Sequence, residues 1–292
     1  MKIYDCTTFH SEHMMMDVRF NALNEHIHKF IVVESLFSHS GEKKKLNFDI
    51  NNYPKFKDKI IYLVIDREPD DLINPLNENI QYKRINSIKR IELSYDFMMS
   101  EIKKLSDNDL IILSDNDEIP NLDSTQFKDS NSDIYIFKQL FFYYKFNLLY
   151  DRMYWFGSKA CTKKKLKSLS WLRNLKNKKY PFWRVDTFFS KTKSSSLKII
   201  NDGGWHFTNV MSAENLYTKM TNFGHHDEFE LSELSVEDLK IKINQGLVFY
   251  DHFAGQEDKN KWEFNYKLKK ISDNLLPDSL IKDKIKLKEW FN

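Results

Sequence analysis

The stretch Asp109-Leu-Ile-Ile-Leu-Ser-Asp115-Asn-Asp117-Glu118-Ile-Pro120 joins a short apolar run to a cluster of carboxylates. The run at 109–113 is typical of a strand covered on both faces, and in open α/β sheets ligands bind at the carboxyl ends of such strands. Extended backbone points Asp115 and Asp117 to the same side, where they repel each other unless a cation lies between them. Because hard oxygen ligands suit Mg²⁺ or Mn²⁺, the stretch predicts a metal site. The alternative is an acidic turn in which Asp115 caps a short helix.

Segments on the N-terminal side of this stretch alternate between strand-like and helix-like patterns. Apolar runs at 2–9, 29–35 and 59–65 predict further buried strands. Ser11 is a candidate N-cap for a helix after the first strand, and an amphipathic pattern at about 77–105 predicts a long second helix. Helices between apolar strands favour an α/β fold with a mostly parallel central sheet flanked by helices.

The second half of the chain has a different character. The segment 132–149 is strand-like and rich in aromatic residues, and five of the seven glycines lie between residues 157 and 246. The lysines at 163–167 and 176–179 are expected on a solvated surface, with a cationic rim that attracts an anionic substrate as the alternative. We therefore expect an irregular, aromatic-rich C-terminal half.

Composition indicates an ordinary folded protein. Of the 292 residues, 41% are hydrophobic and 30% are charged, and the formal net charge of +3 is too balanced to make nucleic acid or an anionic membrane the main partner. Cys6 and Cys161 are too few for a disulfide framework or a four-cysteine zinc site. The sequence shows no internal repeat and no linker, so one domain over 1–292 is expected, ending in a helical tail at 251–292.

The sequence has neither the pattern of a signal peptide nor an apolar run long enough for a membrane helix. A cytoplasmic location in a bacterium or a virus is therefore expected. The G-x-S-x-G, P-loop and G-x-G-x-x-G motifs are also missing from the sequence, which argues against serine hydrolases, P-loop NTPases and enzymes of the dinucleotide-binding type.

Two further stretches carry groups that could do chemistry. In Asn201-Asp-Gly-Gly-Trp-His-Phe207, paired glycines permit close backbone approach to a ligand, and His206 could complete a metal site. The alternative there is a tight turn with a packed tryptophan and a hydrogen-bonded histidine. Gly224-His-His-Asp-Glu228 could supply a metal site or a general base, although its spacing alone favours a polar helix start.

Six segments together resemble family 17 of the glycosyltransferases, whose best-known member adds the bisecting GlcNAc to N-glycans. They follow the family's order between about residues 2 and 230 and comprise Ile3–Phe9, Met16–Leu23, Phe30–Ser35, Ser114–Pro120, Gly203–Phe207 and Lys219–Glu228. The fourth is similar to the family's DxDEIP motif and the fifth to its GGWHF-type segment. The lysine-rich region 163–179 and the tail after about 250 depart from the family pattern, so acceptor specificity is not carried over.

The resemblance implies a GT-A-type, Rossmann-like fold and transfer of a sugar from a UDP-sugar to a glycan hydroxyl, with inversion at the anomeric carbon. GlcNAc is the first choice of sugar, and Mn²⁺ or Mg²⁺ is the implied cofactor. Residues 1–120 would bind the nucleotide sugar and the metal, and residues 121–250 would bind the acceptor and carry catalysis.

The resemblance also implies roles for individual residues. Asp117 would bind the metal directly, Asp115 would contact the ribose or share the metal, and His206 would be the third ligand. The metal would bridge the donor diphosphate and neutralise its charge as it departs. Arg84 would contact the diphosphate with its guanidinium group. The nucleoside pocket would be lined by three residues at the end of the first strand: Thr7, Thr8 and Phe9.

Inversion requires a group that takes the proton of the acceptor hydroxyl as its oxygen attacks. Glu228 is the first candidate and Asp227 the second, because this segment aligns with the family in two registers. Asp202 and His225 are next in order.

Charges within the first half lead to two further expectations. Glu34, at the end of the run 29–35, is expected to pair with Arg19 inside the fold, with a donor contact as the alternative. Because Asp117 has carboxylates on both sides, its replacement is expected to relieve repulsion and to raise stability in the absence of metal.

Two other classes of function are alternatives to a transferase. A metal-dependent phosphodiester hydrolase would use Asp115, Asp117 and Glu118, ideally with two metals about 3.5–4 Å apart. A non-catalytic glycan-binding module would stack its aromatic side chains on sugar faces, and its binding would be insensitive to EDTA and to nucleotide.

Overall fold

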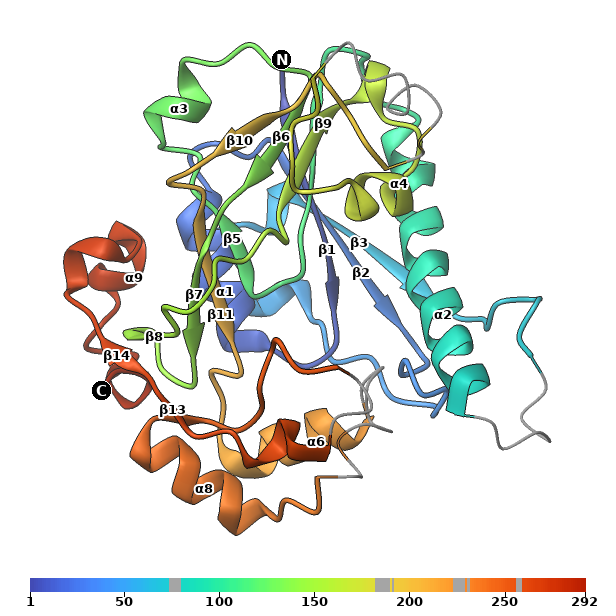
Figure 1. The fold of residues 1–292 in the computed structure, drawn as a ribbon. Helices are drawn as coiled ribbons and strands as arrows, with labels where there is room; N and C mark the ends of the chain where they lie inside the picture. The colour runs from blue at the N-terminus through green and yellow to red at the C-terminus, as the bar shows by residue number, and fades with distance from the viewer. Residues whose placement is uncertain (74–79, 182–189, 191, 223–228, 230–231, 256–258) are drawn as a thin grey trace.

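The computed structural model describes the chain except for residues 74–79, 182–189, 191, 223–228, 230–231 and 256–258. A seven-stranded sheet in the order β10-β6-β9-β4-β1-β2-β3 forms its centre (Figure 1). In that order the strands are Lys198–Ile200, Ile134–Phe137, Lys159–Thr162, Leu110–Leu113, Ile3–Phe9, Lys29–Ser35 and Ile60–Ile65. The four strands predicted from apolar runs are confirmed as β1 to β4, but β3 is an edge strand whose four middle residues are only partly buried.

The seven-stranded sheet, for which the apolar runs predicted mostly parallel strands, is mixed: six strands run in one direction and β9 runs in the other. Strands β4, β1, β2 and β3 pair in parallel, and so do β10 and β6. Strand β9 runs antiparallel to both of its neighbours, β4 and β6. This strand has only four residues and begins with a lysine, so the sequence carried no apolar run from which to predict it.

Helices cover both faces of this sheet. Phe30 of β2 belongs to the core that includes α1 (His13–Leu23), whereas the next residue, Ile31, belongs to the core that includes α2 (Ile80–Ile102). Successive residues of a strand point to opposite faces, so both faces of β2 are buried. This arrangement explains why the central strands are continuous apolar runs.

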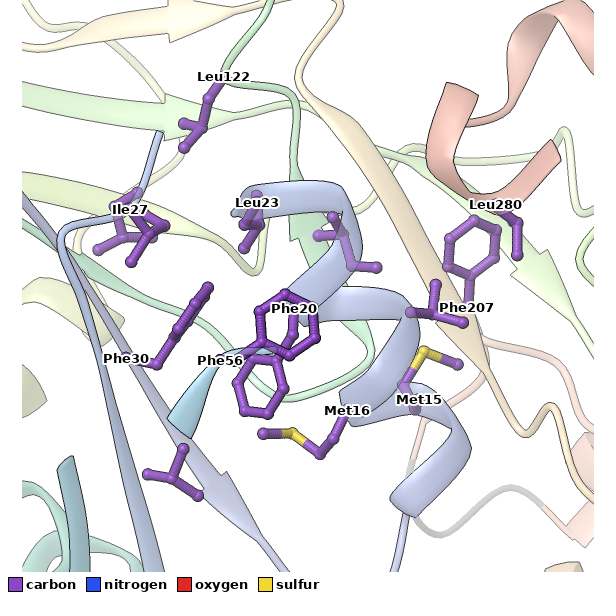
Figure 2. Packing of buried hydrophobic residues seen from close by; sticks show 14 of the residues in the cluster. Met15, Met16, Phe20, Leu23, Ile27, Phe30, Phe56, Leu122, Phe207 and Leu280 are labelled. Atoms are coloured by element: carbon purple, nitrogen blue, oxygen red, sulfur yellow. The ribbon is translucent and has the colours of Figure 1, made fainter. Parts of the chain in front are cut away.

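Helix α1 packs on its far side against the C-terminal part of the chain. Figure 2 shows Phe20 of α1 beside Phe30 and Phe56, with Phe207 and Leu280 on the other side of the helix. The ring centroids of Phe20 and Phe30 are 4.7 Å apart, and those of Phe20 and Phe56 are 5.4 Å apart. Helix α1 is therefore buried on more than one face.

A second sheet has five strands in the order β14-β8-β7-β11-β5. In that order they are Lys269–Lys270, Leu148–Leu149, Leu140–Tyr143, Gly204–Thr208 and Glu118–Pro120. The aromatic segment 132–149 is thus divided between β6 of the first sheet and β7 and β8 of the second. Strands β5 and β11 pair antiparallel with His206 opposite Glu118, which brings two of the candidate stretches together. At Gly204 φ is +111° and a Cβ atom would lie 2.2 Å from the Ile119 carbonyl oxygen, so this position requires glycine.

Short elements complete the described chain. The remaining helices are α3 (Thr125–Lys128), α4 (Leu169–Asn174), α6 (Ala213–Asn222), α8 (Val236–Gln245) and α9 (Asp278–Lys282), and the remaining strands are β12 (Leu247–Val248) and β13 (Tyr266–Lys267). Short 3₁₀ helices occur at Ile50–Asn52, Lys57–Lys59, Lys163–Lys165, Lys259–Glu263, Asp273–Leu275 and Lys288–Trp290. Residues 251–292, expected as a helical tail, contain α9 but also β13 and β14. Among the described residues, no helix combines the length and apolar character needed to cross a membrane.

Candidate active site

A buried ion pair holds the acidic turn between β4 and β5. Arg19 of α1 and Asp5 of β1 are fully buried, with Arg19 Nε 2.8 Å from Asp5 Oδ2 and Nη2 2.5 Å from Oδ1. Arg19 Nη1 donates to the carbonyl oxygens of Asp115 at 3.1 Å and Glu118 at 2.6 Å. The planar guanidinium therefore joins the first strand and the first helix to the turn that carries the carboxylates.

The expected pairing of Glu34 with Arg19 is wrong. Glu34 is buried and forms a salt bridge with Lys44 instead. Its other hydrogen-bond donors are the Tyr62 hydroxyl at 2.8 Å and the backbone N–H groups of Asn47 and Phe48 at 2.8 and 2.9 Å. The register of β1 with β2 places Glu34 opposite Phe9, beyond the position of Asp5, where the loop at 44–48 reaches it.

Breaking the buried pair is expected to destabilise the fold. Arg19→Met keeps side-chain length but leaves the Asp5 carboxylate buried without its partner, so the free energy of unfolding should fall by about 3 kcal/mol or more in urea denaturation. The control Lys128→Met removes the same charge from an exposed pair with Asp123 and should cost less than about 1 kcal/mol. Equal losses in the two variants would contradict the structural role of Arg19.

Glu118 points into the protein. It is fully buried and accepts hydrogen bonds from Trp155 Nε1 at 2.6 Å and from the Asp115 backbone N–H at 2.9 Å. Arg173 Nη1 lies 3.0 Å from its Oε2. Burial raises the pKa of Glu118, but Arg173 and His206 together outweigh burial and lower that pKa below its usual value. These donors occupy both carboxylate oxygens, which disfavours the two-metal hydrolase that would need Glu118 as a ligand.

Asp117 lies beside His206, as the pairing of β5 with β11 requires. Asp117 Oδ1 is 3.4 Å from His206 Nε2, and its Oδ2 is 4.0 Å from Lys219 Nζ of α6. Desolvation raises the pKa of Asp117, but His206 and Lys219 outweigh it and lower the pKa to about 2. The His206 ring stacks on Phe141 with centroids 4.8 Å apart and packs on Trp155 at 4.7 Å. The pair therefore combines an ionised carboxylate with an imidazole held in place by aromatic rings.

Asp115 has a different partner. Its Oδ2 lies 2.6 Å from Arg173 Nη2, and 52% of its side-chain surface is exposed. Loss of surrounding water raises the pKa of Asp115 to about 6 against the opposing effect of Arg173, and the carboxylates of Glu118 and Asp117 add to the rise. Asp115 and Asp117, which the sequence pattern placed together, therefore differ in partner and in pKa.

Asp117 and His206 fit a divalent cation better than Asp115 does. Two ligands at right angles and about 2.1 Å from one ion lie about 3 Å apart, and Asp117 Oδ1 and His206 Nε2 are 3.4 Å apart. Mg²⁺ is commonly held by one or two carboxylates together with substrate phosphates and water. In the part of the chain that the structure describes, no three His, Cys, Asp or Glu side chains are grouped to hold an ion. Asp115, Asp117 and His206, the three residues predicted as metal ligands, thus do not form one three-residue metal site.

A cavity of about 530 Å³ lies next to Asp117. Its wall is formed by the segment after β1, the loop at 38–44, the acidic turn and helix α6. The basic residues that line it are His10, His13, Lys43, Lys44 and Lys219, and the acidic ones are Glu12, Glu42 and Asp117. The volume is within the range of small-molecule sites, and the wall presents three lysines and three carboxylates, so it carries both signs of charge. These lysines differ from those at 163–179 that the sequence suggested for a cationic rim.

Glu12 is a cavity residue that sequence patterns did not single out. Helix α1 begins at His13 with Glu12 as its N-cap residue, not Ser11 as expected, and the Glu12 side chain makes no capping hydrogen bond to the first turn. Glu12 Oε2 accepts hydrogen bonds from the Ser11 backbone N–H at 3.0 Å and from Asn116 Nδ2 at 2.9 Å. Glu12 therefore connects the loop after β1 to the acidic turn, through a contact between distant parts of the sequence that has no local signal.

The residues predicted for the nucleoside and diphosphate contacts lie apart from this cavity. Thr7, Thr8 and Phe9 are the last three residues of β1, and Phe9 packs in the core with its ring 5.2 Å from that of Phe48. None of the three lines the described cavity wall, which starts at His10. Arg84 lies in the N-terminal part of α2 and does not belong to that wall either.

Of the four candidates for the general base, only Asp202 lies among the described residues. Glu228 and Asp227, together with His225, lie outside the described residues. Asp202 is described: its Oδ1 accepts a hydrogen bond from the Ser124 hydroxyl at 2.5 Å, and it does not line the cavity.

The fold and the site define an α/β protein with an acidic turn and a ligand-sized cavity at the end of a strand. Comparison with known proteins shows the family. The model for glycosyltransferase family 17 matches residues 1–256, so the chain belongs to glycosyltransferase family 17 and is a glycosyltransferase. No curated protein matches the chain. Among solved structures it is similar to the inositol-1-phosphate CTP transferase from T. maritima, with 14% identity, a TM-score of 0.29, and coverage of 56% of this chain and 71% of that one. A likeness of that degree carries no argument about function.

Proposed function

We propose that this enzyme is a metal-dependent, inverting glycosyltransferase of the GT-A type that transfers a sugar from a UDP-sugar to a hydroxyl group of a glycan. GlcNAc is the first choice of sugar, because the resemblance to family 17 implies it. The observation that carries the proposal is the pairing of Asp117, which lines a cavity of about 530 Å³, with His206 beside it. A carboxylate and an imidazole next to a ligand-sized cavity are suited to hold a divalent ion against a bound diphosphate.

The cavity would hold the nucleoside diphosphate part of the donor. Lys219 and Lys44 line it and offer positive charge to the phosphates, while Met15 and Trp290 supply apolar surface for the nucleoside. A divalent ion held by Asp117 and His206 would act as a Lewis acid that stabilises negative charge on the departing diphosphate.

The transfer step forms a bond between the acceptor oxygen and the anomeric carbon and breaks the bond from that carbon to the diphosphate oxygen. Attack from the side opposite the leaving group inverts the configuration. The acceptor hydroxyl must lose its proton as the oxygen attacks, and we assign this proton to Glu228, with Asp227 as the second candidate. Both follow α6 in the chain, and α6 places Lys219 on the cavity wall.

Nucleotide binding is expected to depend on the metal. In thermal unfolding with UDP, GDP or CMP, each with Mn²⁺ or with EDTA, UDP with Mn²⁺ should stabilise the protein most. A ligand that binds only the folded state adds about 2.7 kcal/mol at a hundredfold excess over its Kd. Equal stabilisation by UDP in EDTA and in Mn²⁺ would contradict metal-dependent donor binding. Stabilisation by none of the nucleotides would contradict the proposed function itself.

A further inference from the structure

Arg173 is a cation within the acidic turn. Its Nη2 lies 2.6 Å from Asp115 Oδ2, and its Nη1 lies 3.0 Å from Glu118 Oε2 and donates to the Gly157 carbonyl oxygen at 3.1 Å. One guanidinium therefore spans two of the three carboxylates of the turn. Planar bidentate geometry of this kind is specific to arginine, because a lysine ammonium acts as a point charge.

The backbone that carries Arg173 is anchored in the core. Helix α4 buries Leu169 and Leu172, and the buried Leu175 follows it. The side chain of Lys159 in β9 is also buried, and its Nζ donates to the carbonyl oxygens of Arg173 at 2.6 Å and Leu175 at 2.7 Å. A buried ammonium thus binds the C-terminal carbonyl groups of α4, which fixes the point from which the guanidinium extends.

The carboxylates of the turn are consequently divided between two partners. Asp117 faces His206 and Lys219, whereas Asp115 faces Arg173. Asp115 is half exposed, so burial does not prevent it from turning toward an ion beside Asp117; its salt bridge to Arg173 is the interaction that such a movement would break.

We propose that Arg173 is a positioning residue that withholds Asp115 from the metal, so that the described chain offers the ion only Asp117 and His206. The inference rests on the proposed function in one respect, that a divalent ion binds beside Asp117. Two ligands hold a divalent ion weakly, and the oxygens of a bound diphosphate complete its coordination. Arg173 thereby makes metal binding depend on the nucleotide.

Titration of Mn²⁺ without nucleotide, followed by the electron paramagnetic resonance signal of the free ion, tests this role. Arg173→Met releases Asp115 as an additional ligand, so Mn²⁺ should bind about tenfold more tightly than to the wild type, a change of the size produced by the surroundings of metal ligands. Asp115→Asn should change the wild-type affinity little, but it should remove the gain when combined with Arg173→Met. Lys128→Met, which removes the same charge at an exposed pair, should have no effect.

Several results would overturn the inference. They are unchanged or weaker Mn²⁺ binding by Arg173→Met, a gain that persists in the double variant, and an equal effect of Asp115→Asn in both backgrounds. If Arg173→Met does not fold, Arg173→Lys replaces it in the test, because lysine keeps the charge but not the planar bridge. The affinity of Arg173→Lys for Mn²⁺ should rise by less than that expected for Arg173→Met, and an unchanged affinity would overturn the inference. The titration contains neither donor nor acceptor, so it is separate from the proposed function, which fails if UDP does not bind the wild type with Mn²⁺.

Discussion

Replacement of Asp117 with asparagine is expected to abolish sugar transfer in a protein that still folds. The variant keeps the shape of the side chain but loses the negative charge that would hold the metal beside His206, 3.4 Å away. Loss of Lewis-acid stabilisation is worth several kcal/mol, so the rate should fall by at least about 10³-fold when donor turnover is measured with saturating Mn²⁺. The control Asp123→Asn, at an exposed carboxylate, should retain full activity. Undiminished turnover by Asp117→Asn would remove Asp117 from the metal site.

The same variant is expected to be less stable, and the pH dependence has a definite sign. Asp117 has its pKa lowered from the usual 3.8 to about 2 in the folded protein, so its charge stabilises the fold above about pH 4 and this contribution disappears as the pH falls toward 2. At pH 7 the metal-free variant should lose roughly 1–2 kcal/mol of unfolding free energy, and the difference should shrink as the pH falls and vanish only below pH 2. Repulsion among the carboxylates predicted the opposite sign, because the sequence did not reveal Lys219 as a neighbour of Asp117 and gave His206 only the role of a metal ligand. A variant more stable than wild type at pH 7 would restore that earlier expectation.

Glu228→Gln is expected to have the second largest effect. Glutamine keeps the shape and most hydrogen bonds but cannot take a proton at neutral pH, so kcat should fall by about 10²-fold or more while the affinity for UDP with Mn²⁺ stays nearly unchanged. Asp227→Asn is the matched control and should be much milder, which also resolves the two registers of the family resemblance. Weaker donor binding with unchanged kcat would make Glu228 a binding residue. Unchanged kinetics in both variants would place the base elsewhere, with His225 and Asp202 as the next candidates.

The central strands could be predicted from the sequence because burial on both faces leaves a local pattern. The run 29–35 is β2 without any shift, and the acidic stretch follows β4 as expected. Strand β9 and the division of 132–149 between two sheets could not be predicted. Both depend on which strands lie next to each other, and neighbouring strands are set by contacts between distant residues.

The site shows the same division between local and distant signals. The adjacency of Asp117 and His206 was expected, because each residue lies in a motif that is recognisable in the sequence, at 109–120 and at 201–207. Arg173 was missed because it lies in a lysine-rich region that was expected on a solvated surface, and its partner Asp115 is 58 residues away. The expected partner of Arg19 was Glu34, because both are charged residues of buried elements. The pairing with Asp5 depends on the strand register, which has no local signal in the sequence.

A crystal structure of the wild-type enzyme with UDP and Mn²⁺, with the ion located by its anomalous scattering, would test the proposed metal and donor site. We predict one Mn²⁺ ion bound by Asp117 and His206, the UDP diphosphate on that ion, and the nucleoside in the cavity lined by Lys44, Lys219 and Trp290. An ion bound away from Asp117 and His206, or UDP bound outside this cavity, would contradict it.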